Sequence, residues 1–430
     1  MKVIEIPSIA LDGLCQFNAK RYPFLLESVN HNSNNRYSIL FAHPQQTIQL
    51  NHLTEFDFLD ELASQITFSD QQRQDLPFTG GWFVYLAYEL IGQIEPTLLS
   101  KMHDSSLPIA IAVKIPSAII VDHQLDKAFL LDEQGDEDRI TQTLKDIDAI
   151  QAIKTADLSG NLACEVDQKF LSGVEAIKEY IKAGDVFQVN LSRAWQYTLQ
   201  DDCSAVQLYS HLKKSNPAPF SALAQFQNFS IISSSPERLF SVAGDSIETR
   251  PIAGTHPRGQ GKEDETLKQQ LISHPKEQAE HIMLLDLERN DLGRVCEYGS
   301  IDVNEVMTLE TYPYVHHIVS NIKGTLKPDT HVDQLIRALF PGGTITGCPK
   351  IRCMEIIAEL EQGAREAYTG SLGYISNNGK MDLNILIRTM IKQDNMLSFR
   401  AGAGIVFDSK PARELEETTH KAQGILKVFS

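Results

Sequence analysis

Basic residues, long apolar runs and paired cysteines are scarce in this 430-residue sequence. The 39 Lys and Arg are outnumbered by 56 Asp and Glu, which gives a formal net charge of −17. Nucleic acids and anionic membranes bind clustered Lys and Arg, so neither is expected as a partner. No run of about 18 apolar residues is long enough for a membrane span. The six cysteines form no CxxC pair and no zinc-binding spacing, which is typical of reduced thiols.

The N-terminal segment also lacks the basic-then-apolar order of a secretory signal, because Glu5 and Asp12 interrupt it. With 42% hydrophobic and 22% charged residues, the composition is that of a globular protein. We therefore expect a soluble protein in the cytoplasm. A polar stretch at 154–167 is the best candidate boundary, which predicts an N-terminal domain at 1–155 and a second domain at 165–430.

Apolar periodicity predicts strands and helices that do not alternate regularly, which favours the α+β class. Before residue 155 the strand-like runs include 37–41 and 81–86. Ser172 and Gly184 are expected to start and stop a helix. Further strands are predicted at 186–191, 229–233, 367–375, 383–391 and 397–407. A long helix is predicted at 276–295, and a last helix near Pro411 is expected to be capped by Asp408 or Ser409.

Several motifs are ambiguous when each is considered alone. Glu414 and Glu417 lie one turn apart on the last predicted helix, with Lys421 one turn further. Two carboxylates on one face can hold Mg²⁺, but the same spacing is typical of a solvated face with an ion pair. The segment 342–347 imitates a P-loop, but Cys348-Pro349 replaces the required Lys-Ser/Thr pair, so a Walker A site is excluded. A tight turn and a carboxylate-binding helix start both remain open.

Other short motifs are equally open. Gly402 and Gly404 flank one residue after a strand, which fits either backbone approaching a ligand or close strand packing. His316 and His317 should face opposite sides of a strand, so at most one is expected to enter a given site. Glu280 lies in an acidic stretch of the long helix that is either a solvent face or part of a site. No Ser/His/Asp nucleophile signature is present.

Taken together, these segments resemble the chorismate-utilising enzyme family, which includes anthranilate, aminodeoxychorismate, isochorismate and salicylate synthases. The resemblance covers nearly the whole chain and rests on motifs in the family's order, at 184–192, 234–237, 251–255, 286–293, 342–350, 368–374 and 414–421. It implies the fold of anthranilate synthase component I, a two-layer α/β sandwich with antiparallel sheets flanked by helices.

The resemblance also implies roles for individual residues. Glu280 and Glu417 match ligands of Mg²⁺, and Glu414 matches a residue acting through water. Glu237 matches the general acid that protonates the departing 4-hydroxyl of chorismate, and His317 and Thr346 match positions that orient the ring substituents. The positions that match binders of the substrate carboxylates are Tyr368, Arg388, Gly402, Gly404 and Lys421.

Three positions bear on the branch of the family. Gln188 replaces the Lys that activates water in the isochorismate-forming members, which favours amination by ammonia. Asn190 resembles aminodeoxychorismate synthase, and so does the chain length. Ala253 conflicts with this, because the best-studied enzymes of that kind carry a covalently reacting Lys there and anthranilate synthases carry Ala. The expected reaction is amination of chorismate to 4-amino-4-deoxychorismate, with anthranilate synthesis as the alternative.

Two further expectations follow from the resemblance. The chain has no amidotransferase-like cysteine motif, so ammonia is expected from a separate glutaminase subunit. Near the N-terminus, the residues that look like the tryptophan-binding element of the aminating branch are Leu26, Glu27, Ser28, Arg36 and Tyr37. Whether that element binds tryptophan, regulates or is structural stays open.

Overall fold

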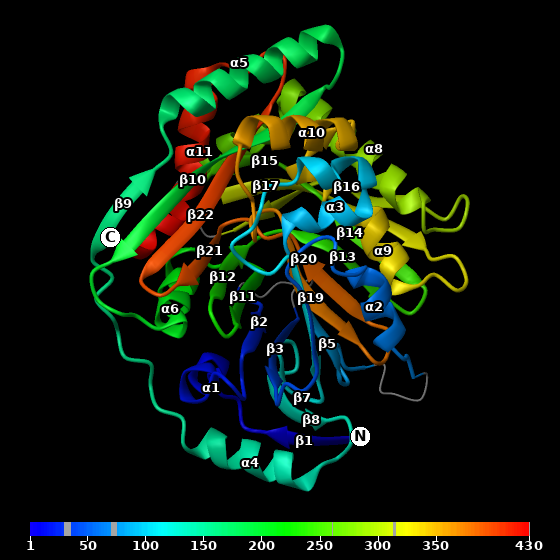
Figure 1. Cartoon of the computed structure of the whole chain (residues 1–430), viewed down its shortest axis with the longest axis vertical. Coiled ribbons are helices and arrows are strands. Elements are labelled where there is room, and N and C mark those ends of the chain that lie inside the picture. The colour runs from blue at the N-terminus through cyan, green and yellow to red at the C-terminus, as the bar shows by residue number, and fades with distance from the viewer. Residues whose placement is uncertain (30–35, 70–74, 260, 313–314, 430) are drawn as a thin grey trace.

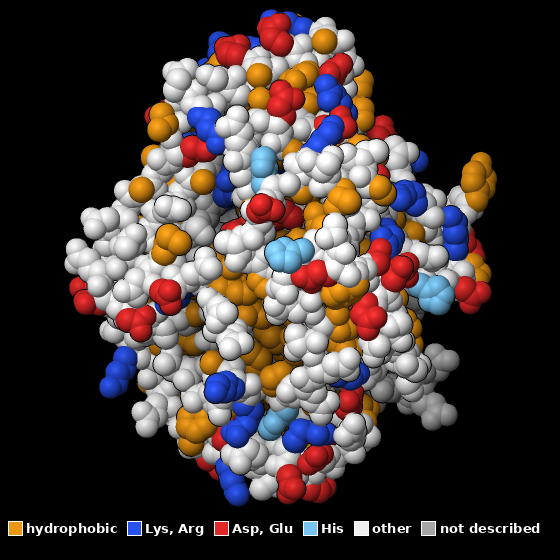
Figure 2. All heavy atoms as spheres, viewed as in Figure 1, with side chains coloured by type: hydrophobic (Ala, Val, Ile, Leu, Met, Phe, Trp, Pro, Cys, Tyr) orange, Lys and Arg blue, Asp and Glu red, His pale blue; other side chains and the backbone are white. Residues whose placement is uncertain are grey.

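Two large antiparallel sheets form the centre of the protein, shown in the computed structural model of Figure 1. The structure describes residues 1–429 except 30–35, 70–74, 260 and 313–314. Within these residues, none of the helices combines the length and the apolar character needed to cross a bilayer. On the face shown in Figure 2, acidic and basic side chains are interspersed.

The first sheet has twelve strands. Their order is β1 (Lys2–Ile6), β8 (Lys127–Asp132), β7 (Ser117–Asp122), β3 (Tyr37–Ala42), β2 (Phe24–Glu27), β11 (Phe220–Gln225), β12 (Ser230–Ser235), β21 (Thr389–Gln393), β22 (Met396–Ile405), β10 (Gln188–Leu199) and β18 (Gly347–Cys348), with β9 (Gly160–Cys164) on β10.

The second sheet has ten strands. Their order is β15 (Ile252–Pro257), β17 (Val315–Thr325), β14 (Ser246–Arg250), β13 (Arg238–Ala243), β20 (Met381–Asn384), β19 (Ser371–Ser376), β5 (Gly81–Leu86), β6 (Ala110–Ile115) and β4 (Thr47–Leu50), with β16 (Asp302–Thr311) on β17. The segments 1–155 and 165–430 both contribute strands to each sheet, so the boundary predicted near residue 160 does not separate the sheets.

Helices cover the outer faces of the two sheets. Those packed on the first sheet are α1 (Leu11–Phe17), α4 (Glu137–Asp148), α6 (Ala205–Ser215) and α11 (Pro411–Leu426). Those packed on the second sheet and the adjoining ends of β10 and β22 are α2 (Phe58–Gln65), α3 (Ile91–Ile94), α5 (Asp167–Ala183), α8 (Pro275–Gly293), α9 (Val332–Leu339) and α10 (Lys350–Glu361). Helix α7 (Lys262–Ser273) contacts β15. The predicted α+β class, with flanked antiparallel sheets, is confirmed.

An aromatic core lies between the sheets. The rings of Phe24 from β2 and Phe83 from β5 stack with centroids 4.0 Å apart. Alternate residues of β5 face opposite sides: Phe83 and Tyr85 enter the inter-sheet core, whereas Trp82 and Val84 pack under the helices. The period of two thus explains why every residue of this strand is buried.

Some predicted element boundaries are wrong, and each difference has a local cause. Helix α5 begins at Asp167 rather than at Ser172, because the apolar face continues back to the buried Phe170. The strand predicted at 186–191 runs from Gln188 to Leu199. Lys410, and neither Asp408 nor Ser409, occupies the cap position of α11, since the Ser409 hydroxyl accepts the Val406 N–H at 3.0 Å instead.

The predicted strand 383–391 is divided into β20 and β21, and this division brings Arg388 to the junction of the sheets. The chain leaves the second sheet after Asn384 and enters the first at Thr389. Arg388 has φ 51, a left-handed conformation that interrupts a strand. Likewise β19 begins only at Ser371, so Tyr368 lies in the turn that precedes it.

A buried ion pair joins several of these elements. The Arg365 guanidinium donates to Glu361 Oε1 at 2.6 Å and Oε2 at 2.9 Å, and both side chains are 1% exposed. Arg365 also donates to the carbonyl oxygens of Asn190 at 2.8 Å and Ile345 at 3.2 Å. It therefore connects the end of α10 to β10 and to the turn at 341–347.

We predict that Arg365→Met lowers the free energy of unfolding by about 3–5 kcal/mol, because removing one partner of a buried pair leaves the other charge buried and unpaired. Urea unfolding measures this change. The matched control is Arg289→Met, which removes an exposed pair with Asp286 (3.3 Å) and should change stability by less than about 0.5 kcal/mol. Equal effects of the two substitutions would contradict the assignment.

Candidate active site

The candidate site is built around two neighbouring strands of the first sheet, β10 and β22. Asn190 pairs with Gly404 across these strands, and Ser192 pairs with Gly402. A Cβ on Gly402 would lie 2.6 Å from both Asn190 Oδ1 and the Tyr368 hydroxyl. A Cβ on Gly404 would lie 2.5 Å from Gln188 Nε2. Both glycines therefore leave room for the side chains that β10 projects over β22.

Gln188 and Asn190 lie on one face of β10 and present two amide groups. Gln188 Nε2 donates to Glu280 Oε1 at 3.0 Å, and Asn190 Nδ2 donates to the carbonyl of Thr344 at 3.4 Å. These acceptors fix the orientation of the amides. Within the described residues, the buried oxygens Gln188 Oε1 and Asn190 Oδ1 have no hydrogen-bond partner. The site thus contains two hydrogen-bond acceptors without a donor.

Lys421 links α11 to the same strands. Its ammonium donates to the Gly402 carbonyl at 3.1 Å and pairs with Glu417 Oε1 at 2.8 Å. Burial lowers the pKa of Lys421, but the charges of Glu417 and Glu280 outweigh this and raise the pKa above its ordinary value. The charges of Glu417 and Glu280 thus both act on this ammonium, and Glu414 is buried one turn before Glu417 on α11.

Glu237 immediately precedes β13 of the second sheet, and its carboxyl group is buried. Its side chain is 4% exposed, and Oε1 has no hydrogen-bond partner among the described residues. Burial raises the pKa of Glu237 to about 7, although the charges of Lys421 and Arg388 act in the opposite direction. The group can therefore hold a proton near neutral pH.

Arg388 and His317 complete the polar surroundings. Burial lowers the pKa of Arg388, and its guanidinium forms no hydrogen bond or ion pair with any residue that the structure describes. Burial, followed by the charge of Arg388, lowers the pKa of His317 to about 3, so the ring is neutral at physiological pH. Tyr312 contacts the His317 ring edge-on, with centroids 5.5 Å apart.

Thr346 and Ala253, two further residues expected at the site, are buried in the backbone segments around it. The Thr346 hydroxyl is buried and donates to the carbonyls of Gly342 and Gly343, while its own carbonyl accepts the Asn190 N–H at 2.9 Å. Ala253 is buried in β15 opposite Ile318. As predicted, the two histidines of β17 diverge, and His316 binds Asp264 at 2.8 Å.

Sequence patterns missed several residues of this site. Glu361 and Arg365 lie in none of the motifs, and their partners lie far away along the chain. Glu288 and Thr344 lie within the motifs at 286–293 and 342–350, but the sequence did not single them out. The described residues also include no group of three or more His, Cys, Asp or Glu side chains arranged to hold a metal ion. Any ion at Glu280 and Glu417 would therefore need oxygen ligands from a bound substrate or water.

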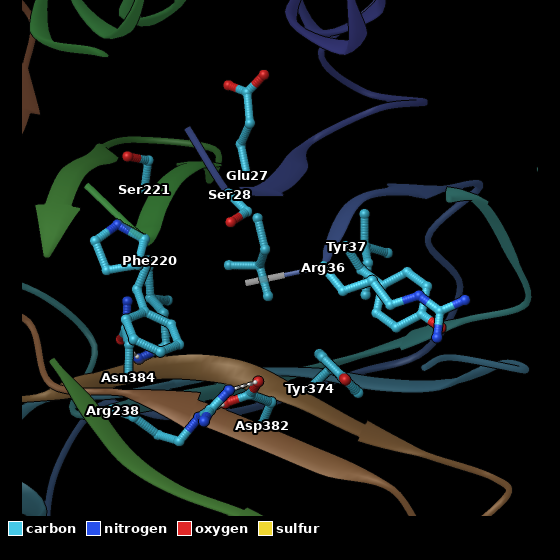
Figure 3. A pocket seen from close by; sticks show the side chains of 14 residues that line it. Glu27, Ser28, Arg36, Tyr37, Phe220, Ser221, Arg238, Tyr374, Asp382 and Asn384 are labelled. Carbon is cyan, nitrogen blue, oxygen red and sulfur yellow. Dashed lines mark hydrogen bonds and ion pairs between the residues drawn. The ribbon is translucent and has the colours of Figure 1, made fainter. Parts of the chain in front are cut away.

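A separate cavity of about 210 Å³ lies between the two sheets, and the five residues of the N-terminal element line it. Figure 3 shows Ser28, Arg36 and Tyr37 on one side and Arg238, Asp382 and Asn384 on the other. Arg238 and Asp382 form a two-point ion pair with both distances 2.9 Å.

Several polar groups of this cavity already have hydrogen-bond or ion-pair partners, and one has none among the described residues. The Glu27 carboxylate accepts the Tyr209 hydroxyl at 2.7 Å and Lys213 at 3.2 Å. Arg36 pairs with Asp122 at 2.9 and 3.0 Å. Asn384 Nδ2 is buried and has no partner among the described residues, whereas its oxygen accepts the Leu372 N–H at 2.9 Å.

Comparison with known proteins gives consistent matches over almost the whole chain. A family model described as "chorismate binding enzyme" matches residues 22–427. An anthranilate synthase component I-like protein of Synechocystis sp. is 41% identical and covers 97% of this chain and 87% of its own length. Aminodeoxychorismate synthase component 1 of Bacillus subtilis is 37% identical, and the match covers 94% of this chain and 91% of that protein.

A solved structure agrees with the fold. The crystal structure of anthranilate synthase component I from Streptococcus pneumoniae has a TM-score of 0.83 and 32% identity, with coverage of 93% of this chain and 94% of that one. The named relatives thus include both an aminodeoxychorismate synthase and anthranilate synthases at similar identity.

Proposed function

Because the chain belongs to the chorismate-binding enzyme family, we propose that it aminates chorismate with ammonia to give 4-amino-4-deoxychorismate. The observation that carries this proposal is the pair of buried amide oxygens of Gln188 and Asn190 that lack donors. An amide oxygen accepts hydrogen bonds but does not take up a proton at ordinary pH, so it cannot activate water as a base. Ammonia supplies N–H donors and is already a nucleophile.

The remaining side chains fit a dianionic substrate with a leaving hydroxyl group. The Arg388 guanidinium, which has no hydrogen-bond or ion-pair partner among the described residues, can bind one substrate carboxylate through two parallel hydrogen bonds. Lys421 and Tyr368 border Gly402 and are proposed to bind the other carboxylate. Glu237 is the proposed acid that donates its proton to the departing 4-hydroxyl, and neutral His317 and Thr346 are proposed to help orient the ring substituents.

Glu280 and Glu417 are the residues that would hold Mg²⁺, with Glu414 acting through water. The donor set fits this ion, because both side chains offer carboxylate oxygens and Glu417 already pairs with a cation, the ammonium of Lys421, at 2.8 Å. Bound Mg²⁺ would offset the repulsion between an acidic protein and a carboxylate substrate.

Anthranilate synthesis remains the second candidate, and Ala253 is the observation that favours it. A methyl side chain cannot add covalently to the ring, so a lysine-bound intermediate cannot form at this position. For C4 amination, we therefore propose that a small nucleophile, water or ammonia, adds at C2 with loss of the 4-hydroxyl. Ammonia then adds at C4 and expels the C2 group, so that chorismate and one ammonia give aminodeoxychorismate and one water.

A separate glutaminase subunit is proposed as the physiological source of ammonia. The sequence contains no amidotransferase-like cysteine motif, and Cys15, Cys203, Cys296 and Cys353 are buried. Chorismate and ammonia are thus the proposed small-molecule partners of this chain.

The function is tested by supplying chorismate, Mg²⁺ and ammonium salt at alkaline pH and identifying the product by mass and ultraviolet spectrum. We expect 4-amino-4-deoxychorismate, which a separate lyase would convert to 4-aminobenzoate. Fluorescent anthranilate formed without an added lyase would establish the second candidate, and isochorismate as the main product would refute both. Mass spectrometry of the protein during turnover should show no covalent adduct at position 253 in the natural chain.

The metal assignment is tested with Glu417→Gln, which removes one charge at nearly constant size. We expect kcat/KM at limiting Mg²⁺ to fall at least about 100-fold, since a ligand is lost. The matched control is Glu416→Gln, because Glu416 lies next to it on α11 but its side chain is 69% exposed. Near-full activity of the Glu417 variant at limiting Mg²⁺ would refute the assignment.

We also propose that the inter-sheet cavity accepts tryptophan. Its walls combine apolar side chains such as Leu26 and Leu372 with the unpaired amide donor of Asn384, which suits an aromatic ring with a carboxylate.

Isothermal titration with L-tryptophan should give saturable binding to one site per chain. Asn384→Asp should weaken it at least about 10-fold, because the variant replaces a donor by an anion facing the ligand's carboxylate. The exposed Asn161→Asp is the control and should bind normally. Absence of binding to the natural chain would leave the cavity without this role.

A further inference from the structure

Glu310, Tyr312 and His317 share one face of the second sheet. Glu310 of β16 is the direct cross-strand partner of His317 on β17, and directly opposite residues of antiparallel strands point to the same face. Tyr312 follows Glu310 by two positions and returns to that face. The next pair, Thr311 and His316, points to the opposite face, where the Thr311 hydroxyl lies 3.0 Å from His316 Nδ1. The register thus places Glu310 and Tyr312 beside the histidine of the site.

The Tyr312 ring covers one side of the His317 imidazole. The two rings meet at 62° with their centroids 5.5 Å apart, which is an edge-to-face arrangement. His317 is 2% exposed, so its ring is surrounded by protein. The χ2 torsion of a histidine is broad when nothing restrains the ring. The contact with Tyr312 therefore limits the direction in which the ring nitrogens of His317 face.

Tyr312 is itself held through its hydroxyl group. The hydroxyl donates to Glu310 Oε2 at 2.5 Å, a short hydrogen bond to a carboxylate. The other oxygen of this carboxylate, Glu310 Oε1, accepts Arg250 Nη2 at 2.6 Å. Arg250 also pairs with Glu305 Oε2 at 2.8 Å. A series of contacts thus runs from Arg250 through Glu310 and Tyr312 to the ring of His317.

We propose that Tyr312 is a positioning residue for His317, and that the pair of Arg250 and Glu310 holds Tyr312 in place. This inference rests on the proposed role of His317 in orienting the ring substituents of the substrate. None of the three supporting residues belongs to the proposed binding or catalytic groups. A ring that is fixed before the substrate arrives does not have to be ordered during the reaction, so its position acts on kcat more than on KM.

The experiment measures the consumption of chorismate at saturating Mg²⁺ and ammonium salt, and it separates kcat from KM for chorismate. Tyr312→Leu removes the edge-to-face contact, so kcat should fall about 10-fold with KM changed less than about twofold. Tyr312→Phe keeps the ring but loses the hydrogen bond to Glu310, so kcat should fall only about threefold. The matched control is Tyr298→Leu, which should leave both constants unchanged because Tyr298 is fully exposed.

A double-mutant cycle tests whether Tyr312 acts through His317. In a His317→Ala background the group to be positioned is absent, so adding Tyr312→Leu should change kcat less than about twofold. A fall of about 10-fold in both backgrounds would overturn the inference, because Tyr312 would then act independently of His317. If Tyr312→Leu does not fold, Glu310→Ala takes its place in the cycle with an expected fall of about threefold, since Arg250 keeps its pair with Glu305.

The outcomes separate this inference from the proposed function. The cycle follows the loss of chorismate and therefore holds for any product, so anthranilate as the product would refute the proposed reaction and leave the inference standing. An unchanged kcat in Tyr312→Leu would overturn the inference alone. If His317→Ala leaves kcat unchanged, the proposed role of His317 is wrong, and the inference is wrong with it.

Discussion

The buried charges of Glu361 and Arg365 are the constraint on which the site depends. The Glu361 carboxylate accepts hydrogen bonds from Arg365, from Arg400 at 3.1 Å, and from the Ser192 N–H and hydroxyl at 2.8 Å each. Burial raises the pKa of Glu361, but the two arginines outweigh it and lower the pKa to about 2. A charge buried this deeply persists only when its hydrogen bonds are complete, so the surrounding strands cannot shift independently.

This pair determines where several groups of the candidate site lie. Arg365 binds the backbone carbonyls of Asn190 and Ile345, and its guanidinium lies 5.4 Å from the centre of the Tyr368 ring. One side chain thereby fixes β10, the turn at 341–347 and the turn before β19. The polar groups of the site come from these three segments, from α8, α11 and β17, and from the residues just before β13 and β21, so residues far apart in sequence face one space.

Glu237, the proposed general acid, and the inter-sheet cavity are direct neighbours in the chain and in space. Glu237 belongs to the site, whereas the next residue, Arg238, lines the cavity. The Glu237 carbonyl accepts the Ile385 N–H at 3.0 Å, and the residue before Ile385, Asn384, also lines the cavity. A ligand that displaced β13 or β20 would therefore act on the backbone that carries Glu237, through packed strands and not through solvent.

Local pattern by itself determined the α+β class, the strand at 81–86, the long helix α8 and the end of α5, because each depends on residues close together in the chain. Motif order indicated the family and most of the site residues. Tertiary structure decided that both parts of the chain share both sheets, and that the strand predicted at 383–391 breaks at Arg388. It also decided which groups are left without partners. Burial and pairing arise only when distant segments pack, so a single sequence carries no signal of them. Examples are the Gln188 and Asn190 oxygens, Glu237 and Arg388.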